Sequence, residues 1–262
     1  MLNDYLTFII LIVSGFGSGL FVGIGSGTTA AIMITCLTVL LNHSVHDAIG
    51  TSLLIEGVIC GIAGLVFLRK DNVSLRPVFL LILAGSIGSF LGSRFTSVTP
   101  ESGLLFFMGS LLILMGGTFI IKGLQKNIDY IESKINVESL RENKIAFFII
   151  FGFIAGFGSG FSGMGIGGVI ALVLILILGY KIHTAIGTSL VMMFFISGSG
   201  SIGHILSNEI VIRAAILAGS AAALGSVSGA LVANKINEDK LGRLIGFIIV
   251  ILGIAIFFRV FI

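Results

Sequence analysis

The stretch "SGFGSGLFVGIGSGTT" (residues 14–29) contains six glycines, and "GFGSGFSGMGIGGV" (residues 156–169) contains seven. Both lie inside the two longest apolar segments of the chain, near 5–41 and 145–180. A helix needs roughly 20 apolar residues to cross a bilayer, and each glycine inside a helix costs about 1 kcal/mol relative to alanine. These two segments are therefore too long for one simple span and too rich in glycine for one continuous helix.

The composition is that of an integral membrane protein. Of 262 residues, 56% are hydrophobic and 10% are charged, and the mean hydropathy is +1.18. A soluble domain carries about 25% charged residues. The net charge of +3 comes without a basic cluster, which argues against a nucleic-acid partner. The two cysteines, Cys36 and Cys60, lie in apolar runs and form no metal-binding or disulfide pattern.

Charged or polar residues bound eight apolar segments, six of which have the length of an ordinary spanning helix. The segments lie near 5–41, 48–68, 76–95, 102–122, 145–180, 185–206, 210–233 and 241–261. The sequence therefore predicts an all-α polytopic protein of the cell (inner or plasma) membrane, with the lipid bilayer as its surroundings.

The chain also contains an internal repeat. "HDAIGTSLL" at 46–54 aligns with "HTAIGTSLV" at 183–191, an offset of 137 residues. The same offset pairs Arg76 with Arg213, Gly88 and Gly92 with Gly225 and Gly229, Gly109 and Gly116 with Gly246 and Gly253, and Lys122 with Arg259. We therefore expect two four-segment transmembrane repeats, 1–122 and 145–262, joined by a charged linker at 123–144.

The orientation of the repeats depends on the two long segments. If each crosses the membrane once, the repeats are parallel and loop Lys and Arg residues divide ten to five between the two sides. If each is broken or re-entrant, the repeats are inverted and the division becomes twelve to three. The positive-inside rule favours the inverted arrangement, with both termini outside.

Three explanations of the glycine strings compete. "GMGIGG" at 163–168 fits the dinucleotide pattern G-x-G-x-x-G, but that motif requires a βαβ unit and its flanks here are membrane segments. The second explanation is close helix packing, which suits the pairs Gly88/Gly92 and Gly225/Gly229. In the first string it suits the i, i+4 series Gly15, Gly19, Gly23 and Gly27, but it leaves Gly17 and Gly25 unexplained.

The third explanation is a helix break that lines a binding site. Transporters use such breaks to direct free backbone N–H groups at anions. The hydroxyls of Ser26, Thr28 and Thr29 follow the first break and could add hydrogen-bond donors. Packing and a break can operate together, but the occurrence of the same break in both halves favours a site between them.

Other polar residues lie at membrane depth. "AIGTSL" occurs twice and places Thr51/Ser52 and Thr188/Ser189 one turn into the second and sixth segments, where they could cap helix starts or complete the site. Glu56 is the only carboxylate well inside a span, which makes it a candidate proton carrier. Its repeat counterpart is Met193.

Four other residues lie near segment ends. His204, near the end of the sixth segment, is a second proton-coupling candidate or a boundary histidine. His46 and His183 are expected to act as interfacial caps, and Arg94 is expected to extend toward the membrane surface. No catalytic triad, metal cluster or cofactor motif is present, so the sequence argues against an enzyme and predicts no cofactor or metal.

The chain resembles the TauE/SafE family of sulfite and organosulfur-anion exporters. The resemblance rests on the two glycine-rich segments, the two "AIGTSL" motifs, the histidine of the sixth segment and the G-xxx-G of the third segment. The resemblance extends from Phe8 to Phe258. It implies an anion site formed by the glycine motifs, the two threonine–serine pairs and His204. The glycine motifs fall on Gly23, Gly25 and Gly27 and on Gly163, Gly165, Gly167 and Gly168. The first string departs from the family's glycine triplet, and neither string is followed by proline.

We therefore expect a transporter that exports a small anion by alternating access, with possible proton coupling. The resemblance implies sulfite, a sulfonate or another organosulfur anion as the substrate, whereas the residues alone indicate only a small anion. A membrane scaffold or assembly subunit and a passive anion channel are the alternatives. The sequence is also compatible with a homodimer.

Overall fold

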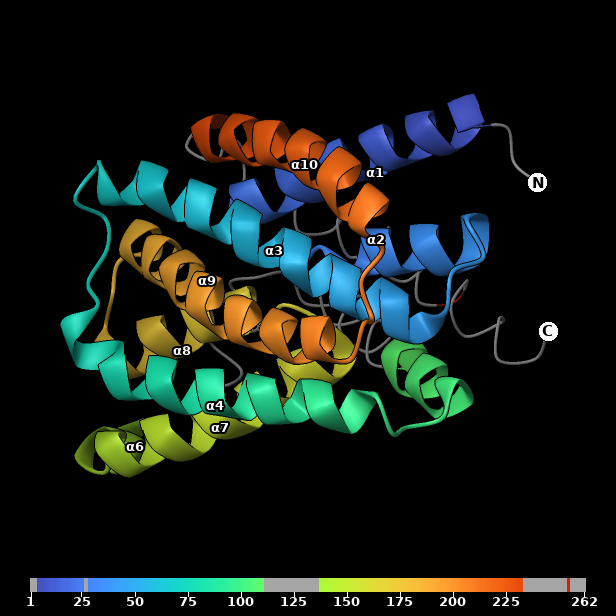
Figure 1. Cartoon of the computed structure of the whole chain (residues 1–262). Helices are drawn as coiled ribbons and strands as arrows, with labels where there is room; N and C mark the ends of the chain where they lie inside the picture. Colours follow the sequence, from blue (N-terminus) through green and yellow to red (C-terminus); the bar gives the residue numbers. More distant parts are fainter. Residues whose placement is uncertain (1–3, 26–27, 111–136, 233–253, 255–262) are drawn as a thin grey trace.

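The computed structural model describes residues 4–25, 28–110, 137–232 and 254, and the ordered elements in these ranges are all helical (Figure 1). The helices are α1 (Asp4–Gly25), α2 (Ala30–Thr35), α3 (Val45–Leu68), α4 (Phe79–Thr96), α6 (Val137–Glu142), α7 (Lys144–Ser162), α8 (Gly167–Leu178), α9 (Ile182–Leu206) and α10 (Ile212–Val232). A π-helical turn, Cys36–Leu40, extends α2, a 3-10 turn, Arg76–Val78, precedes α4, and residues 101–110 are also helical. The predicted all-α fold is confirmed for this part of the chain.

Within the described ranges, six helices are long and apolar enough to cross a membrane: α1, α3, α4 with its preceding turn, α7, α9 and α10. α2 with its π-helical turn and α8 are apolar but shorter. The outward faces carry large apolar side chains such as Ile87 and Leu224, as expected for helices that face lipid. Most of the predicted segments 102–122 and 241–261 and of the linker 123–144 lies outside the described residues.

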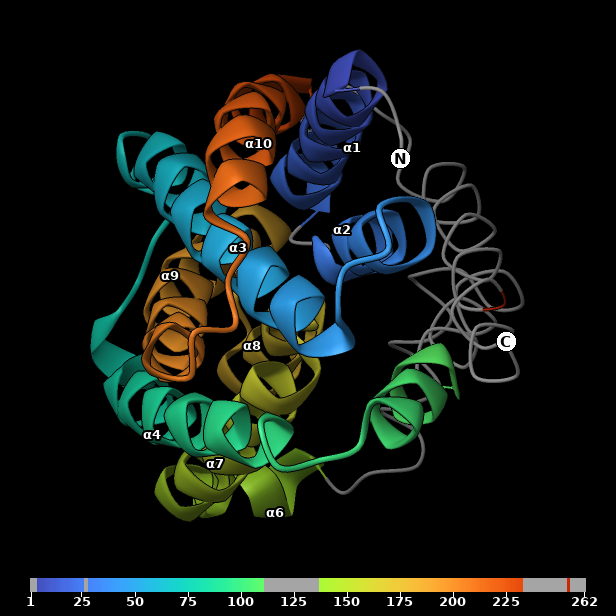
Figure 2. The same ribbon diagram turned by 45° about the vertical axis from the view of Figure 1, so that its right-hand side comes forward.

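The long helices associate as three pairs. α3 and α9 form the central pair and are the most buried of the long helices. The pair α1 and α10 packs on one side of it, and the pair α4 and α7 packs on the other (Figure 1). The short helix α2 packs against α3, and the short helix α8 packs against α9 (Figure 2).

Glycines set the distance within the two outer pairs. On α1, a Cβ added to Gly15 or Gly19 would meet the backbone of Ala218 or Ala222 on α10. On α7, a Cβ added to Gly160 would meet the backbone of Ser89 on α4. The equivalent close contacts are made by Gly23, Gly225 and Gly229 between α1 and α10, and by Gly88, Gly92 and Gly156 between α4 and α7. The predicted packing is confirmed for Gly15, Gly19 and Gly23 and for the pairs Gly88/Gly92 and Gly225/Gly229, and Gly156 and Gly160 pack in the same way.

One end of the bundle, called here the His204 end, holds the starts of α1, α3 and α10 and the ends of α4 and α9. Asp4 at the start of α1 pairs with Arg213 at the start of α10, with Oδ1 and Nη1 3.5 Å apart. At the start of α3, His46 Nε2 lies 3.1 Å from the carbonyl oxygen of Thr96, the last residue of α4. α1 and α3 therefore begin at the same end of the bundle.

The opposite end, called the Tyr180 end, holds the loop after α3 and the start of α9. The hydroxyl of Tyr180 donates to Ser74 Oγ in that loop at 3.0 Å. Arg141, just before α7, donates to the carbonyl of Leu176 near the end of α8 at 2.8 Å. α7 therefore begins on the same side of the bundle as the place where α8 ends.

Candidate functional site

Both glycine strings interrupt a helix. α1 ends at Gly25 and α2 begins at Ala30, while α7 ends at Ser162 and α8 begins at Gly167. The residue after α7, Gly163, has a φ of 67°, a left-handed conformation that glycine adopts without a Cβ clash. Backbone groups at these breaks lack the partners that a continuous helix would supply, so they are free to bind other groups.

Glu56 of α3 connects the two breaks. Its side chain is 0% exposed, and its Oε2 accepts hydrogen bonds from Thr29 N–H at 3.3 Å and from Thr29 Oγ1 at 2.9 Å. The hydroxyl of Thr28 donates to the same oxygen at 3.5 Å. That hydroxyl also accepts the N–H of Gly165, in the second break, at 2.9 Å. One carboxylate oxygen is thus surrounded by donors, and one of these donors is held by the other break.

The second carboxylate oxygen, Glu56 Oε1, is buried and has no hydrogen-bond partner among the described residues. It lies directly against Gly165, where an added Cβ would overlap it. An unsatisfied buried oxygen is energetically costly, and in a native structure it needs an explanation, of which a functional role is one. Three buried hydroxyls also lack a partner within the described part of the chain: Ser89 on α4, Ser159 on α7 and Ser197 on α9.

The structure distributes the other predicted site residues unevenly. Ser52 Oγ lies beside Gly163, 3.0 Å from the position of an added Cβ, so it borders the second break. Gly167 and Gly168 form the first turn of α8. Gly25 is the last residue of α1, whereas Gly23 packs against the α10 backbone. Ser26 and Gly27 lie outside the described residues.

Thr29 carries the closest contact to Glu56, although the sequence argument treats it only as a supplementary donor. The available signal is the threonine doublet directly after the first glycine string. The two hydroxyls have different additional partners. Thr29 Oγ1 also lies 3.1 Å from the Ser52 carbonyl oxygen, whereas Thr28 Oγ1 accepts the Gly165 N–H. Thr29 therefore belongs in the candidate site with Thr28, Glu56 and Gly165.

The repeated threonines Thr51 and Thr188 do not contact Glu56 in any hydrogen bond of the described chain. Thr51 Oγ1 instead accepts the backbone N–H of Val211, before α10, at 2.9 Å. Thr188 Oγ1 accepts the N–H of Ser74, before α4, at 3.0 Å. Each threonine thus anchors a loop of the opposite half of the chain. Ser189 Oγ bonds the Ile186 carbonyl of its own helix at 2.8 Å.

We predict that Thr51→Val and Thr188→Val each lower the free energy of unfolding by about 1–2 kcal/mol, because a backbone N–H loses its acceptor. The two anchors lie at opposite ends of the bundle, so the losses should add in the double variant. Thr35→Val is the matched control, since the Thr35 hydroxyl bonds only the Ala31 carbonyl of its own helix. Thermal unfolding of the purified protein provides the measurement. A loss no larger than that of the control would contradict the anchoring role.

His204 belongs to a separate polar cluster. It is 0% exposed, its Nε2 lies 3.1 Å from the Gly160 carbonyl, and its Nδ1 lies 2.8 Å from Glu209 Oε2. A carbonyl can only accept, so Nε2 must carry a hydrogen. The Nδ1–Glu209 contact must then contain one further proton, held by the imidazole or by the carboxyl group.

Glu209 lies in the loop between α9 and α10. Burial alone would raise the pKa of its carboxyl group, but the hydrogen bonds from His204 and Ser97 and the positive charge of His204 and His46 outweigh burial and lower it. These contacts therefore favour the ionised form of the Glu209 carboxyl group. Through Gly160, this cluster touches the last turn of α7 just before the second break.

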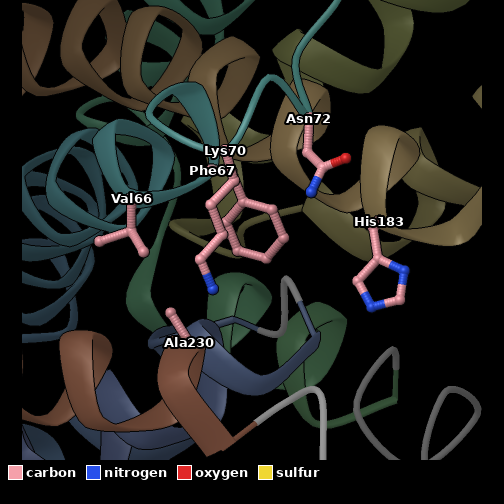
Figure 3. Close-up of a pocket in the computed structure, with 6 residues that line it drawn as sticks. All are labelled: Val66, Phe67, Lys70, Asn72, His183 and Ala230. Carbon is pink, nitrogen blue, oxygen red and sulfur yellow. The ribbon is translucent and has the colours of Figure 1, made fainter.

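A small recess at the Tyr180 end brings together side chains of different chemistry (Figure 3). Lys70 and Asn72, from the loop after α3, line it with His183 from the start of α9. The apolar part of the lining is Val66, Phe67 and Ala230. His183 is the only sequence-predicted residue here, and its position at a helix start agrees with an interfacial role. Within the described residues, no group of three or more His, Cys, Asp or Glu side chains could hold a metal ion.

Comparison with known proteins identifies a family and several relatives that the chain resembles. The family described as "Sulfite exporter TauE/SafE" matches residues 7–256. The probable membrane transporter protein YdhB of Bacillus subtilis is 25% identical over 249 residues, covering 91% of this chain and 90% of that protein. A probable membrane transporter protein of Xylella fastidiosa is 26% identical over 258 residues, covering 94% and 91% respectively. No solved structure matches the chain.

Proposed function

The chain belongs to the TauE/SafE family of membrane transporters, and from that premise we propose that it moves a small anion across the membrane through a site at the two helix breaks. The observation that carries this proposal is the convergence of Thr28 and Thr29 on Glu56 Oε2, with the Thr28 hydroxyl held in turn by the Gly165 N–H of the second break. Hydroxyl and backbone N–H donors that bind one carboxylate oxygen have the chemistry to bind an oxygen of a sulfite or sulfonate group.

The second break supports the same site. α8 is a twelve-residue helix whose first turn begins at Gly167 and Gly168, and the positive end of a helix dipole favours an anion. The buried and unpartnered Glu56 Oε1 lies against the residues that lead into this helix. Gly167 and Gly168 place no side chain on the first turn of α8, which allows a ligand to approach its backbone closely. Ser52, beside Gly163, adds a hydroxyl.

The family name favours sulfite, a sulfonate or another small organosulfur anion as the substrate, and export as the direction. The relatives are named only as probable membrane transporter proteins, so the choice among these anions rests on the family description. An oxyanion with several acceptor oxygens suits a set of donors that comes from two sides. Proton coupling through Glu56 or His204 is part of the proposal.

We further propose that the two repeats are inverted and that α1–α2 and α7–α8 are re-entrant. For the first repeat, the re-entrant course is supported because α1 and α3 begin at the same end of the bundle. For the second repeat, it is supported because Arg141, just before α7, contacts Leu176 near the end of α8. In that arrangement Arg94 and Arg213 lie at the His204 end, where they contact Ser207 and Asp4. The positive-inside rule then assigns the His204 end to the outside.

We propose that transport proceeds by alternating access around a site to which both repeats contribute. The outer helix pairs each join one helix of the first repeat to one of the second. A rocking motion would therefore need to carry whole pairs rather than separate their close glycine contacts. The loop anchors Thr51 and Thr188 also link the repeats.

The test is transport in proteoliposomes with a panel of sulfite, thiosulfate, sulfate, methanesulfonate and acetate. We expect saturable flux of at least one sulfur oxyanion, and Thr29→Val should lower its kcat/KM by about 10–100-fold, the loss expected for hydrogen bonds to a charged group. Thr38→Val is the matched control, because the Thr38 hydroxyl bonds only the Ile34 carbonyl.

Other outcomes separate the alternatives. If no anion of the panel crosses faster than in protein-free liposomes, the transporter proposal fails and a scaffold role is favoured. Flux that rises linearly with anion concentration and ignores an imposed proton gradient would favour a passive channel. Equal flux in Thr29→Val and wild type would move the anion site away from the first break.

A further inference from the structure

The Glu56 carboxylate accepts the same hydrogen bonds from Thr28 and Thr29 that a bound anion would need. We propose that Glu56 is a built-in competitor for the anion site, so that an anion binds when the carboxylate takes up a proton and releases its donors. This inference rests on the proposed function, because it concerns the same site. It adds a mechanism that makes proton binding and anion binding mutually favourable.

The geometry of Oε2 carries the first step. Thr29 directs both its N–H and its hydroxyl at this oxygen, at 3.3 and 2.9 Å, and the Thr28 hydroxyl approaches it at 3.5 Å. The carboxylate is fully buried, so it cannot exchange these donors for solvent without moving. A second negative oxygen entering the same donors would be repelled by the first, and this repulsion is strong where water is excluded.

The geometry of Oε1 carries the second step. This oxygen has no partner among the described residues, whereas Oε2 is already surrounded by donors. We therefore assign the proton to Oε1, because Oε2 already accepts from Thr28 and Thr29. The proton neutralises the carboxyl group, which weakens the hold of Oε2 on Thr28 and Thr29 and frees these donors for the incoming anion. The position of Gly165 directly against Oε1 places this event at the second break.

Among the described residues, Glu56 is the only side chain at the two helix breaks that can gain or lose a charge by binding a proton. The neighbouring breaks present Thr28, Thr29 and Gly165, which do not titrate in the physiological range. On α3 itself, the thiol of Cys60 lies close enough to interact with Glu56. The titratable groups on the helices packed against α3 have other partners or positions. At the His204 end, Asp4 pairs with Arg213, and His204 pairs with Glu209. His183 lies at the start of α9, and Cys36 on the π-helical turn contacts Ser14.

The consequence is reciprocal, as linkage requires. Protonation of Glu56 raises the affinity for the anion, and the anion raises the affinity of Glu56 for a proton. Above the pKa of Glu56 in the free protein, the Kd for an anion of constant charge should rise about tenfold per pH unit. One proton should be taken up for each anion bound.

The experiment uses the full-length protein in detergent micelles and two probes, methanesulfonate and thiosulfate, which stay ionised across the working pH range. Calorimetric titrations in two buffers of different ionisation enthalpy give both the Kd and the number of protons taken up. For wild type we expect the tenfold dependence per pH unit and uptake of one proton. Glu56→Gln mimics the protonated side chain, so it should bind at every pH with the affinity that wild type reaches only at low pH, without proton uptake.

A matched control and a second readout keep the test decisive. Cys60→Ser removes the nearest titratable group and should retain the wild-type pH dependence. If Glu56→Gln does not fold, the proton count of wild type decides, because a site without the competitor takes up none. Probe binding that is the same in wild type and Glu56→Gln, with no proton uptake, overturns this inference and leaves the anion site in place. If neither protein binds either probe, the proposed anion site itself fails and the inference fails with it.

Discussion

Alanine at position 165 is expected to displace the Glu56 carboxylate and to lower the free energy of unfolding by about 2–4 kcal/mol. The added Cβ would overlap Glu56 Oε1, and the carboxylate can escape only by leaving Thr28 and Thr29. Hydrogen bonds to a charged group contribute about 1.5–3 kcal/mol each, and a displaced carboxylate would remain buried without partners. Transport should fall to background for the same reason.

The double variant Gly165→Ala with Glu56→Ala isolates the cause. Removing the carboxylate frees the volume that the new Cβ needs, so Gly165→Ala should cost less than about 1 kcal/mol in the Glu56→Ala background. The coupling energy of the cycle should therefore be about 1–4 kcal/mol. If Gly165→Ala costs the same in both backgrounds, the glycine is required by the backbone and not by the carboxylate.

The chain offers a direct way to measure these stabilities. It has no tryptophan, so intrinsic tryptophan fluorescence is absent. Its two cysteines, Cys36 and Cys60, are both buried and free. A dye that becomes fluorescent on reaction with thiols therefore reports thermal unfolding, because neither thiol is accessible until the helices separate.

Sequence reasoning reaches the membrane class and the positions of the helices because these depend on composition and hydropathy. Hydropathic runs of about 20 residues specify spanning helices, and six are present among the described residues. The cumulative cost of glycine in a helix placed the interruptions, and α7 ends at Ser162 before the second run of glycines. These signals are local, so a single sequence contains them.

The contacts that form the candidate site are not local. Thr28 and the Gly165 N–H meet across 137 residues, and Thr51 reaches Val211 across 160. Which face of α3 points at the breaks depends on how the helix is rotated against its neighbours, and the even hydrophobicity of a membrane helix does not reveal that rotation. The sequence therefore marked Thr51 and Thr29 as similar hydroxyls, although one anchors a loop and the other binds Glu56.

The roles of individual glycines divide in the same way. The i, i+4 spacing indicated that Gly15, Gly19 and Gly23 share a packing face and that Gly17 does not, and this is confirmed: a Cβ at Gly17 would meet nothing within 4 Å. In the second string, Gly156 and Gly160 pack against α4, while a Cβ at Gly158 would likewise meet nothing within 4 Å. Part of each glycine string therefore serves packing, and the break occupies only its later residues.

Gly19→Ala and Gly156→Ala are expected to lower the free energy of unfolding by about 2–4 kcal/mol each. The added Cβ of Gly19 would overlap the backbone of Ala222, and that of Gly156 would overlap the backbone of Gly85. Unlike a flexible side chain, a helix backbone cannot move aside locally, so the whole helix pair must separate. Separation forfeits the close contacts that hold helices together in a membrane, where the hydrophobic effect between helices is absent.

Each variant has a control two residues away on the same helix. Gly17→Ala and Gly158→Ala place the new methyl group in open space and should leave stability unchanged or raise it by up to about 1 kcal/mol, because alanine favours the helix. The thiol-reactive assay should therefore separate Gly19→Ala from Gly17→Ala, and Gly156→Ala from Gly158→Ala, by several degrees. Equal losses within each pair would mean that the glycines are needed for backbone flexibility along the whole string. Packing would then not explain why the first part of each glycine string is rich in glycine.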